Sequence, residues 1–256
     1  MDTGVSTMST TQTINDFAAK DGNGVFPNIP RADVAKGLRT RASDADTIYQ
    51  DRSSLCGPAT LCWSILRKRP EMYVDYVTSV YDTGEGVLGD LKVKPGSDCR
   101  SSKLNGKISA VDWVSLASIR DSENSVFDYQ STDNEFSGIT MPNHLESWMK
   151  KTGHTGVKNK TNIWATKDID NLEEAADLCG KGYTVALFLW ANLLEGYWGG
   201  WTTVPDHWIS MTRAPVFKGG KVVDLGFWTW AKRWNINSSI ERWESGHFGY
   251  VAGKLK

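Results

Sequence analysis

The chain lacks an excess of charge of either sign. Its 256 residues include 29 Lys and Arg against 30 Asp and Glu, so the formal net charge is −1 at pH 7. Binding to nucleic acid phosphates or to an anionic membrane usually draws on a basic excess. We therefore expect neither nucleic acid nor a membrane as a partner.

Long apolar runs are absent as well. The longest apolar stretch, Tyr183 to Leu194, is shorter than the ~18 residues that a spanning helix needs and is typical of a buried strand. The N-terminus has no basic start followed by an apolar core, so it is not a Sec signal peptide. These absences predict a protein that is cytoplasmic in the cell that makes it, with any export following a non-Sec route.

Cysteine is scarce. The chain has four cysteines, and they show neither the paired spacing of a zinc site nor the density of a disulfide scaffold. His144 and His154 stand ten residues apart with no cysteine nearby, and the glycine-bearing stretches lack the Gly-Lys-Ser/Thr end of a phosphate loop. The sequence therefore predicts no metal and no cofactor.

The distribution of apolar residues predicts an α+β fold. Residues 1–30, rich in Ser, Thr, Asp and Gly, predict a flexible N-terminal tail or a docking segment, and residues 31–256 predict one domain. Helical patterns occupy 55–66, 70–84, 108–120, 141–151 and 172–179, with a loop or irregular hairpin at 84–100. Strand patterns follow at 183–190, 207–214, 221–230 and 247–255. The expected architecture is a helical part followed by an antiparallel sheet.

Cys56 is the first candidate for chemistry. It lies at the start of the predicted helix 55–66, where unpaired N–H groups and the helix dipole stabilise a thiolate, so we expect a lowered pKa. Gly57 would let a substrate approach the backbone, and Pro58 fits a first helical turn. The alternative is a small buried residue at a helix entry, because free cysteine is often buried.

Three further residues are candidates to assist Cys56 in nucleophilic catalysis. Gln50, six residues earlier, is a candidate oxyanion donor. His207 opens a predicted strand and is a candidate base, and Asp224 on the following strand is a candidate to orient its imidazole. The alternatives are Asn235 or Asn237 for the orienting role, His247 as the base, and Cys62, which we assign to the core, as the nucleophile.

The order Gln, Cys, His, Asp resembles the papain-like cysteine peptidase superfamily. Cys56 and His207 are separated by 151 positions, close to the ~130–150 typical of papain-like enzymes. The stretch LCGPATLCWSIL resembles the Cys-Gly-Pro-Ala start of bacterial peptidase domains that process bacteriocin leaders, and of papain-fold bacterial toxins. It departs from the Cys-Gly-Ser-Cys-Trp of papains, since Cys62-Trp63 follows Cys56 by six residues, and Asp224 stands where papain has Asn.

The resemblance implies a papain-like fold, with Cys56 in a helical lobe and His207 and Asp224 in an antiparallel sheet. It implies a cysteine hydrolase that cleaves peptide or amide bonds of a peptide or protein substrate. A bacterial secreted effector or toxin, neutralised in its producer by an immunity protein, is the context it suggests. A glutamine deamidase or transglutaminase-type toxin, a peptidoglycan amidase or endopeptidase, and a binding module without activity remain alternatives.

Tryptophan is abundant near His207. Among the 12 tryptophans of the chain, Trp198 and Trp201 flank two glycines and are predicted to line a substrate cleft. Trp208, directly after His207, is a third candidate for substrate binding. Its place in a strand favours the alternative, a buried core position.

Overall fold

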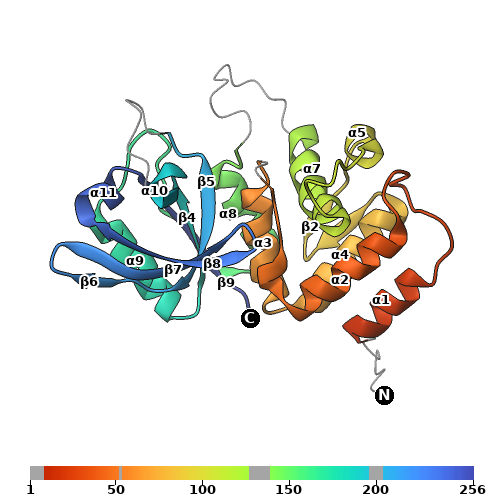
Figure 1. Cartoon of the computed structure of the whole chain (residues 1–256), viewed down its shortest axis with the longest axis horizontal. Helices are drawn as coiled ribbons and strands as arrows, with labels where there is room; N and C mark the ends of the chain where they lie inside the picture. Colours follow the sequence, from red (N-terminus) through yellow and green to blue (C-terminus); the bar gives the residue numbers. More distant parts are fainter. Residues whose placement is uncertain (1–8, 52–53, 127–138, 196–203) are drawn as a thin grey trace.

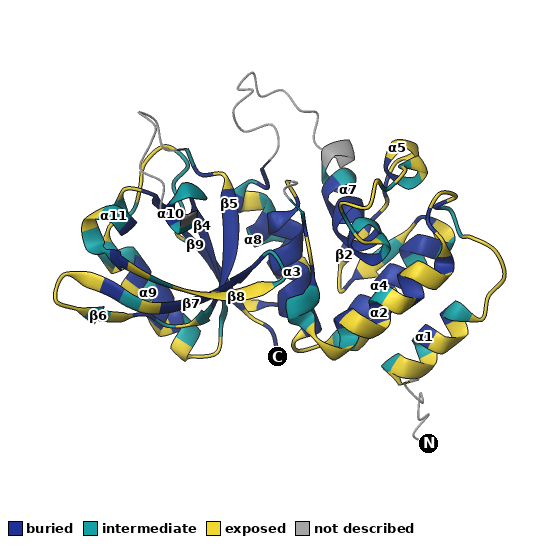
Figure 2. Cartoon of the chain, viewed as in Figure 1, coloured by how far each residue is buried: buried dark blue, intermediate teal, exposed yellow. Residues whose placement is uncertain are grey.

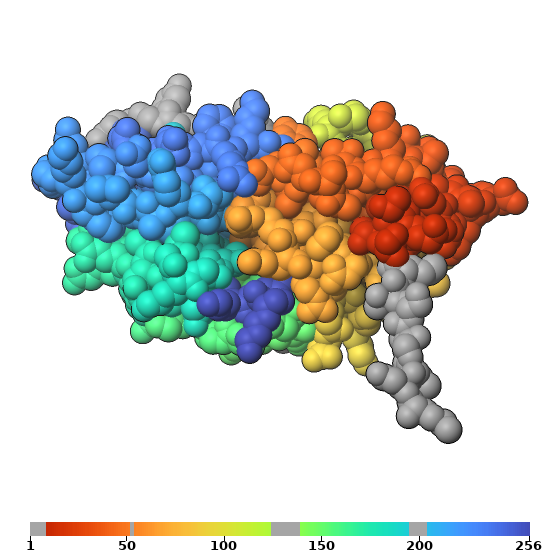
Figure 3. All heavy atoms as spheres, turned by 90° about the horizontal axis from the view of Figure 1, so that it is seen from below, coloured from red at the N-terminus to blue at the C-terminus, as the bar shows by residue number. Residues whose placement is uncertain are grey.

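The helices of the N-terminal part and the sheet of the C-terminal part lie side by side (Figure 1). A computed structural model describes residues 9–51, 54–126, 139–195 and 204–256 of the chain. Seen from below, the two parts form adjoining masses, mainly red to yellow on one side and green to blue on the other (Figure 3). The predicted α+β class with an antiparallel sheet is confirmed.

The helical part is built around α3. Each of its residues is buried, because apolar or small side chains occupy every face of this helix. The elements of this part are α1 (Thr10–Ala18), α2 (Arg31–Ser43), η1 (Ala45–Thr47), α3 (Cys56–Leu66), α4 (Pro70–Thr83), the hairpin β1 (Gly86–Leu88) and β2 (Leu91–Val93), α5 (Ser97–Ser101), α6 (Ala110–Asp112), the π-helical turn η2 (Trp113–Ala117), α7 (Ser118–Val126) and α8 (Pro142–Lys151).

The sheet of the described residues has seven strands, and each pairing is antiparallel. Their order is β3-β9-β4-β5-β7-β6, and β8 also pairs with β7. The elements of this part are β3 (Thr155–Asn159), α9 (Ile169–Gly180), β4 (Thr184–Leu189), α10 (Asn192–Glu195), β5 (His207–Arg213), β6 (Val216–Lys218), β7 (Lys221–Thr229), β8 (Lys232–Ser239), α11 (Ile240–Glu244) and β9 (His247–Lys254).

Both faces of the central strands are covered (Figure 2). On one face Phe188, Trp208 and Trp228 join the core around α3, and Trp228 stacks on Trp63 with ring centroids 5.4 Å apart. On the other face, alternate residues of the same strands pack against α9 and α11. Double coverage explains why β4 is apolar from Val185 to Leu189, as strands buried on both sides are.

The prediction of a flexible tail over residues 1–30 is wrong for the part that the structure describes. Ser9 caps α1, and Ile14 and Phe17 on that helix are 2% exposed. Phe26 and Ile29, in the following segment, are fully buried. These apolar residues are few and widely spaced, so they form no run in the sequence, yet each is covered by the rest of the helical part. Residues 1–8 lie outside the described residues.

Within the described ranges, no helix combines the length and the apolar character needed to cross a bilayer.

Candidate active site

Cys56 is the first residue of α3, and its sulfur faces backbone N–H groups. The backbone N–H groups of Trp208, Gly57 and Cys56 itself are near enough to this sulfur to lower its pKa. Trp208 belongs to β5 in the sheet, so the thiol lies where the start of α3 meets β5. The sulfur is thereby placed beside the residue that follows His207.

Burial dominates the protonation of this thiol. Cys56 is 3% exposed, and desolvation raises its pKa to about 11, against the three N–H groups that lower it and with a smaller contribution from the Asp206 carboxylate. The expectation of a lowered pKa is therefore wrong. The sulfur does lie at a helix N-terminus as predicted. However, its removal from water raises the pKa by more than the nearby N–H groups lower it.

His207 is the first residue of β5 and is held on two sides. Its Nε2 lies 2.9 Å from the hydroxyl of Thr229, at the end of β7. Its ring stacks on Trp230 with centroids 4.6 Å apart and planes 16° from parallel. The residue is 5% exposed, and burial lowers the pKa of His207 to about 4, so the imidazole is neutral at pH 7.

Gln50 joins the same cluster through Thr229. The Gln50 side chain is almost fully buried, and its amide Nε2 donates to the Thr229 hydroxyl at 3.4 Å. Its neighbour Tyr49 donates its backbone N–H to Asp112, which is paired with the buried Arg41 through an Nε to Oδ1 contact of 3.0 Å. This ion pair positions the loop that carries Gln50.

The prediction that Asp224 orients His207 is wrong. Asp224 is exposed and lies 3.4 Å from Arg213, in a left-handed conformation (φ 57°) in the irregular part of β7. Asn235 and Asn237 also lie there, bonded to Arg213 and to the Asp224 backbone. Because β5 and β7 are antiparallel, the start of β5 faces the end of β7 rather than its middle.

Thr229 therefore occupies the position expected for Asp224, and the sequence reasoning missed it. A signal for it existed: the strand pattern at 221–230 ends there, and an antiparallel return strand brings its last residues to the first residue of the preceding strand. A threonine is easily overlooked because its hydroxyl carries no charge.

Two predicted substrate contacts are wrong. A Cβ on Gly57 would lie 2.4 Å from Thr140, so the space beside this glycine is filled by protein and not by substrate. Trp208 is 1% exposed, stacks on Phe188 at 4.3 Å and donates its indole N–H to the Thr140 carbonyl at 2.8 Å. Trp208 thus has the core position that was the alternative. Trp198 and Trp201 lie outside the described residues.

The rival residues lie elsewhere in the interior. Cys62 is fully buried in α3 with its pKa raised by desolvation, in keeping with its assignment to the core. His247 packs its ring 5.3 Å from that of Trp243 on α11, on the face of the sheet away from α3. Among the described residues, no three His, Cys, Asp or Glu side chains are grouped to hold a metal ion.

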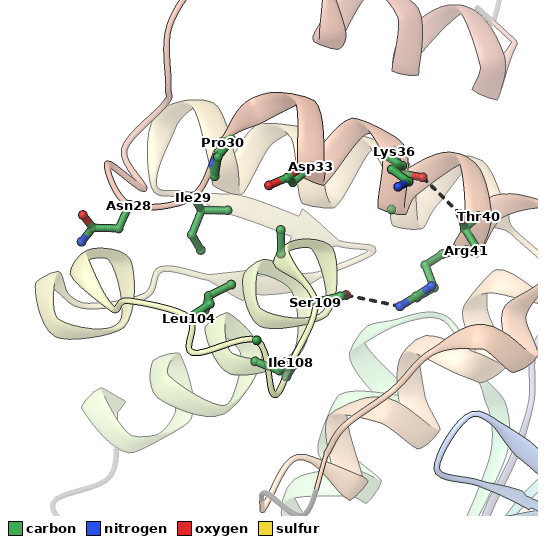
Figure 4. A pocket seen from close by; sticks show the side chains of 13 residues that line it. Asn28, Ile29, Pro30, Asp33, Lys36, Thr40, Arg41, Leu104, Ile108 and Ser109 are labelled. Atoms are coloured by element: carbon green, nitrogen blue, oxygen red, sulfur yellow. Dashed lines mark hydrogen bonds between the residues drawn. The ribbon is translucent and has the colours of Figure 1, made fainter.

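A cavity of about 460 Å³ lies between α2 and the loop that precedes α6 (Figure 4). Asp33 and Lys36 line it from α2, and a hydrogen bond of 3.3 Å from Arg41 to Ser109 crosses one side. Its lining residues do not include Gln50, Cys56, His207 or Thr229.

Comparisons with protein-family models, with curated proteins and with solved structures find no match. The function is therefore inferred from the side chains of the site.

Proposed function

We propose that this protein is a cysteine hydrolase that cleaves peptide or amide bonds. Cys56 is the nucleophile, His207 the general base and acid, and Gln50 a donor to the oxyanion. The observation that carries the proposal is that the start of α3 packs against β5, with the Trp208 N–H near enough to the Cys56 sulfur to lower the pKa of the thiol. This packing seats a thiol at a helix N-terminus against the residue next to a buried histidine, although 151 positions separate the two in the chain.

Thr229 is assigned the orienting role. Its hydroxyl engages Nε2 of His207, so proton transfer is assigned to Nδ1. Trp230, stacked on the ring, keeps water from one face of the imidazole. Because Thr229 lies where an Asp was expected, no carboxylate among the described residues bonds the His207 ring to favour imidazolium. This is in keeping with the low pKa of His207.

The thiol and the imidazole are both neutral before substrate binds, because desolvation disfavours a lone charge on either group. Transfer of the thiol proton to the imidazole creates two opposite charges together, and their attraction offsets part of that cost. His207 is therefore assigned as the base that takes the proton as the sulfur attacks, rather than as a resting imidazolium.

The reaction then has two halves. The sulfur bonds to the carbonyl carbon, and the electron pair of the C=O bond moves to the oxygen, where Gln50 and the Cys56 N–H donate hydrogen bonds. The C–N bond breaks as His207 gives its proton to the leaving amine. Water next adds to the thioester while His207 takes its proton, and that proton returns to the sulfur as the acid leaves.

The proposal extends to a papain-like fold and to a bacterial effector or toxin role, both of which rest on the resemblance of the sequence motifs. Its test is incubation with a peptide library derived from a proteome, with products identified by mass spectrometry. The wild type should yield fragments, and the Cys56→Ala and His207→Asn variants should yield none. Cys179→Ala, which removes a half-buried thiol on α9, should cleave like the wild type.

Other products would change the assignment. Conversion of glutamine to glutamate without fragmentation would replace hydrolysis of the peptide bond with deamidation. Equal results for the wild type and Cys56→Ala would overturn an enzymatic role for this thiol.

A further inference from the structure

A second cavity, of about 330 Å³, adjoins the start of α3. Leu55, which immediately precedes Cys56, forms part of its wall, whereas Cys56 itself does not line it, so the cavity lies one residue away from the proposed nucleophile along the chain. Its volume is at the lower end of the range for small-ligand pockets, which suits one side chain of a substrate rather than a whole ligand.

The lining of this cavity is mainly apolar. Leu55, Cys99 and Ala117 are each 6% exposed and present carbon and sulfur, and the half-buried Trp113 adds an aromatic ring. Trp113 and Ala117 are the first and last residues of the π-helical turn η2, and such turns occur frequently at functional sites. A long aliphatic stem would be covered well by these groups.

Two carboxylates also line the cavity. Asp98 lies on the exposed end of α5, and Asp121 accepts the Gly96 N–H at 2.6 Å with one of its oxygens. Neither has a Lys or Arg within ion-pair distance in the described part of the chain. Arg120 lines the cavity too, but commits one amino group to the Ile139 carbonyl.

We propose that this cavity, beside Leu55 and lined by Trp113, Asp98 and Asp121, receives a lysine or arginine side chain of the substrate near the bond to be cleaved. The methylenes of that side chain lie against the apolar wall, and its cation faces the two carboxylates, which outnumber the single guanidinium of Arg120. The inference rests on the proposed function, because a specificity cavity requires a reaction beside it.

The test reads cleavage sites from the peptide library on both sides of the broken bond. At one position flanking the broken bond, the wild type should favour Lys and Arg over Leu, Met and the acidic residues by about two- to fivefold. The Asp98→Asn/Asp121→Asn variant should lose that preference while still cleaving. Asparagine retains an acceptor for the Gly96 N–H, and an unchanged melting temperature would show that the double variant folds.

Asp33→Asn is the matched control, because Asp33 is an exposed acid that lines the other cavity (Figure 4); it should keep the basic preference. Cleavage without a basic preference, or with one that the double variant retains, would overturn this inference and leave the proposed function standing. Absence of cleavage by every variant, including the wild type, would overturn both.

Discussion

At the scale of single residues, the Thr229 hydroxyl is the centre of the candidate site. It lies 2.9 Å from Nε2 of His207 and accepts from Gln50 at 3.4 Å. A hydroxyl can donate or accept toward an imidazole, whereas a carboxylate can only accept. Thr229 can therefore accept the Nε2–H of the neutral tautomer that the proposed proton transfer to Nδ1 requires.

Replacement of Thr229 tests this role. Thr229→Val keeps the shape and removes the hydroxyl, so kcat/KM for peptide cleavage should fall by about 10- to 100-fold. Thr229→Ser, which keeps the hydroxyl, should restore most of the rate. In Thr229→Asp the carboxylate would favour imidazolium and raise the pKa of His207, which moves the acid limb of the pH–rate profile upward; an unmoved limb would contradict the contact.

The protonation of Cys56 and His207 predicts the pH dependence of the site. Because the pKa of His207 is about 4, the base is available above that pH, and kcat/KM should rise as pH passes through about 4. Because the pKa of Cys56 is about 11, its alkylation by iodoacetamide, followed by intact mass, should keep rising into the alkaline range. A plateau of labelling below pH 7 would instead indicate a resting thiolate–imidazolium pair.

At the scale of elements, those with strong end signals were predictable. Pro70 at the first turn and Gly84 in the left-handed conformation (φ 80°) delimit α4 as expected, and the apolar stretch at 55–66 is α3. The strands β3, β6 and β8 were missed because few of their residues are buried. A polar strand at or near the edge of a sheet carries little period-two apolar signal.

The contact between α3 and the segment before α8 supplies a prediction at this scale. Gly57→Ala would place a methyl group 2.4 Å from Thr140, so Thr140 or the helix must shift, and the free energy of unfolding should fall by about 1–3 kcal/mol. Urea denaturation measures this loss. Gly180→Ala in α9, where an added methyl meets no atom within 4 Å, should leave stability unchanged or raise it slightly.

At the scale of the whole molecule, the candidate site combines segments from both parts of the chain. Asp46 holds these parts together: its carboxylate accepts the Trp63 indole N–H at 2.8 Å and pairs with Arg233, and its carbonyl accepts the Trp228 indole N–H at 3.0 Å. The sequence indicated Gln50, Cys56 and His207 by type and order. The antiparallel return strand at 221–230 pointed to the end of β7, but the register that brings Thr229 itself to His207 is a property of the folded sheet.

The buried histidines predict instability toward acid. His154 links Ser64 on α3 to Thr152, with nitrogen to oxygen distances of 2.9 and 3.0 Å, and burial lowers its pKa to about 4. Desolvation lowers the pKa values of His207 to about 4 and of His247 to about 3. In the unfolded chain these imidazoles take up protons near pH 6.5. The stability that their neutral forms contribute is therefore fully present above that pH and is lost as the pH falls toward 4.

Between pH 6.5 and pH 4, each such histidine should lower the free energy of unfolding by about 1.4 kcal/mol per pH unit. Urea midpoints between pH 7 and pH 4 measure the slope. In His154→Gln, the amide can still bond Ser64, but one titrating imidazole is removed. The free energy of unfolding should then fall by about 1.4 kcal/mol less per pH unit than in the wild type. The same slope in the variant would mean that His154 does not hold its neutral form in the folded protein.

The hydroxyl shared by Gln50 and His207 makes these two side chains energetically coupled. The free-energy effects of substitutions at the two positions should not be additive, because each substitution alters the Thr229 hydroxyl that the other side chain also bonds. Under the proposed function, the oxyanion donor Gln50 and the base His207 could not be optimised one at a time. Either would have to be redesigned together with the threonine that joins them.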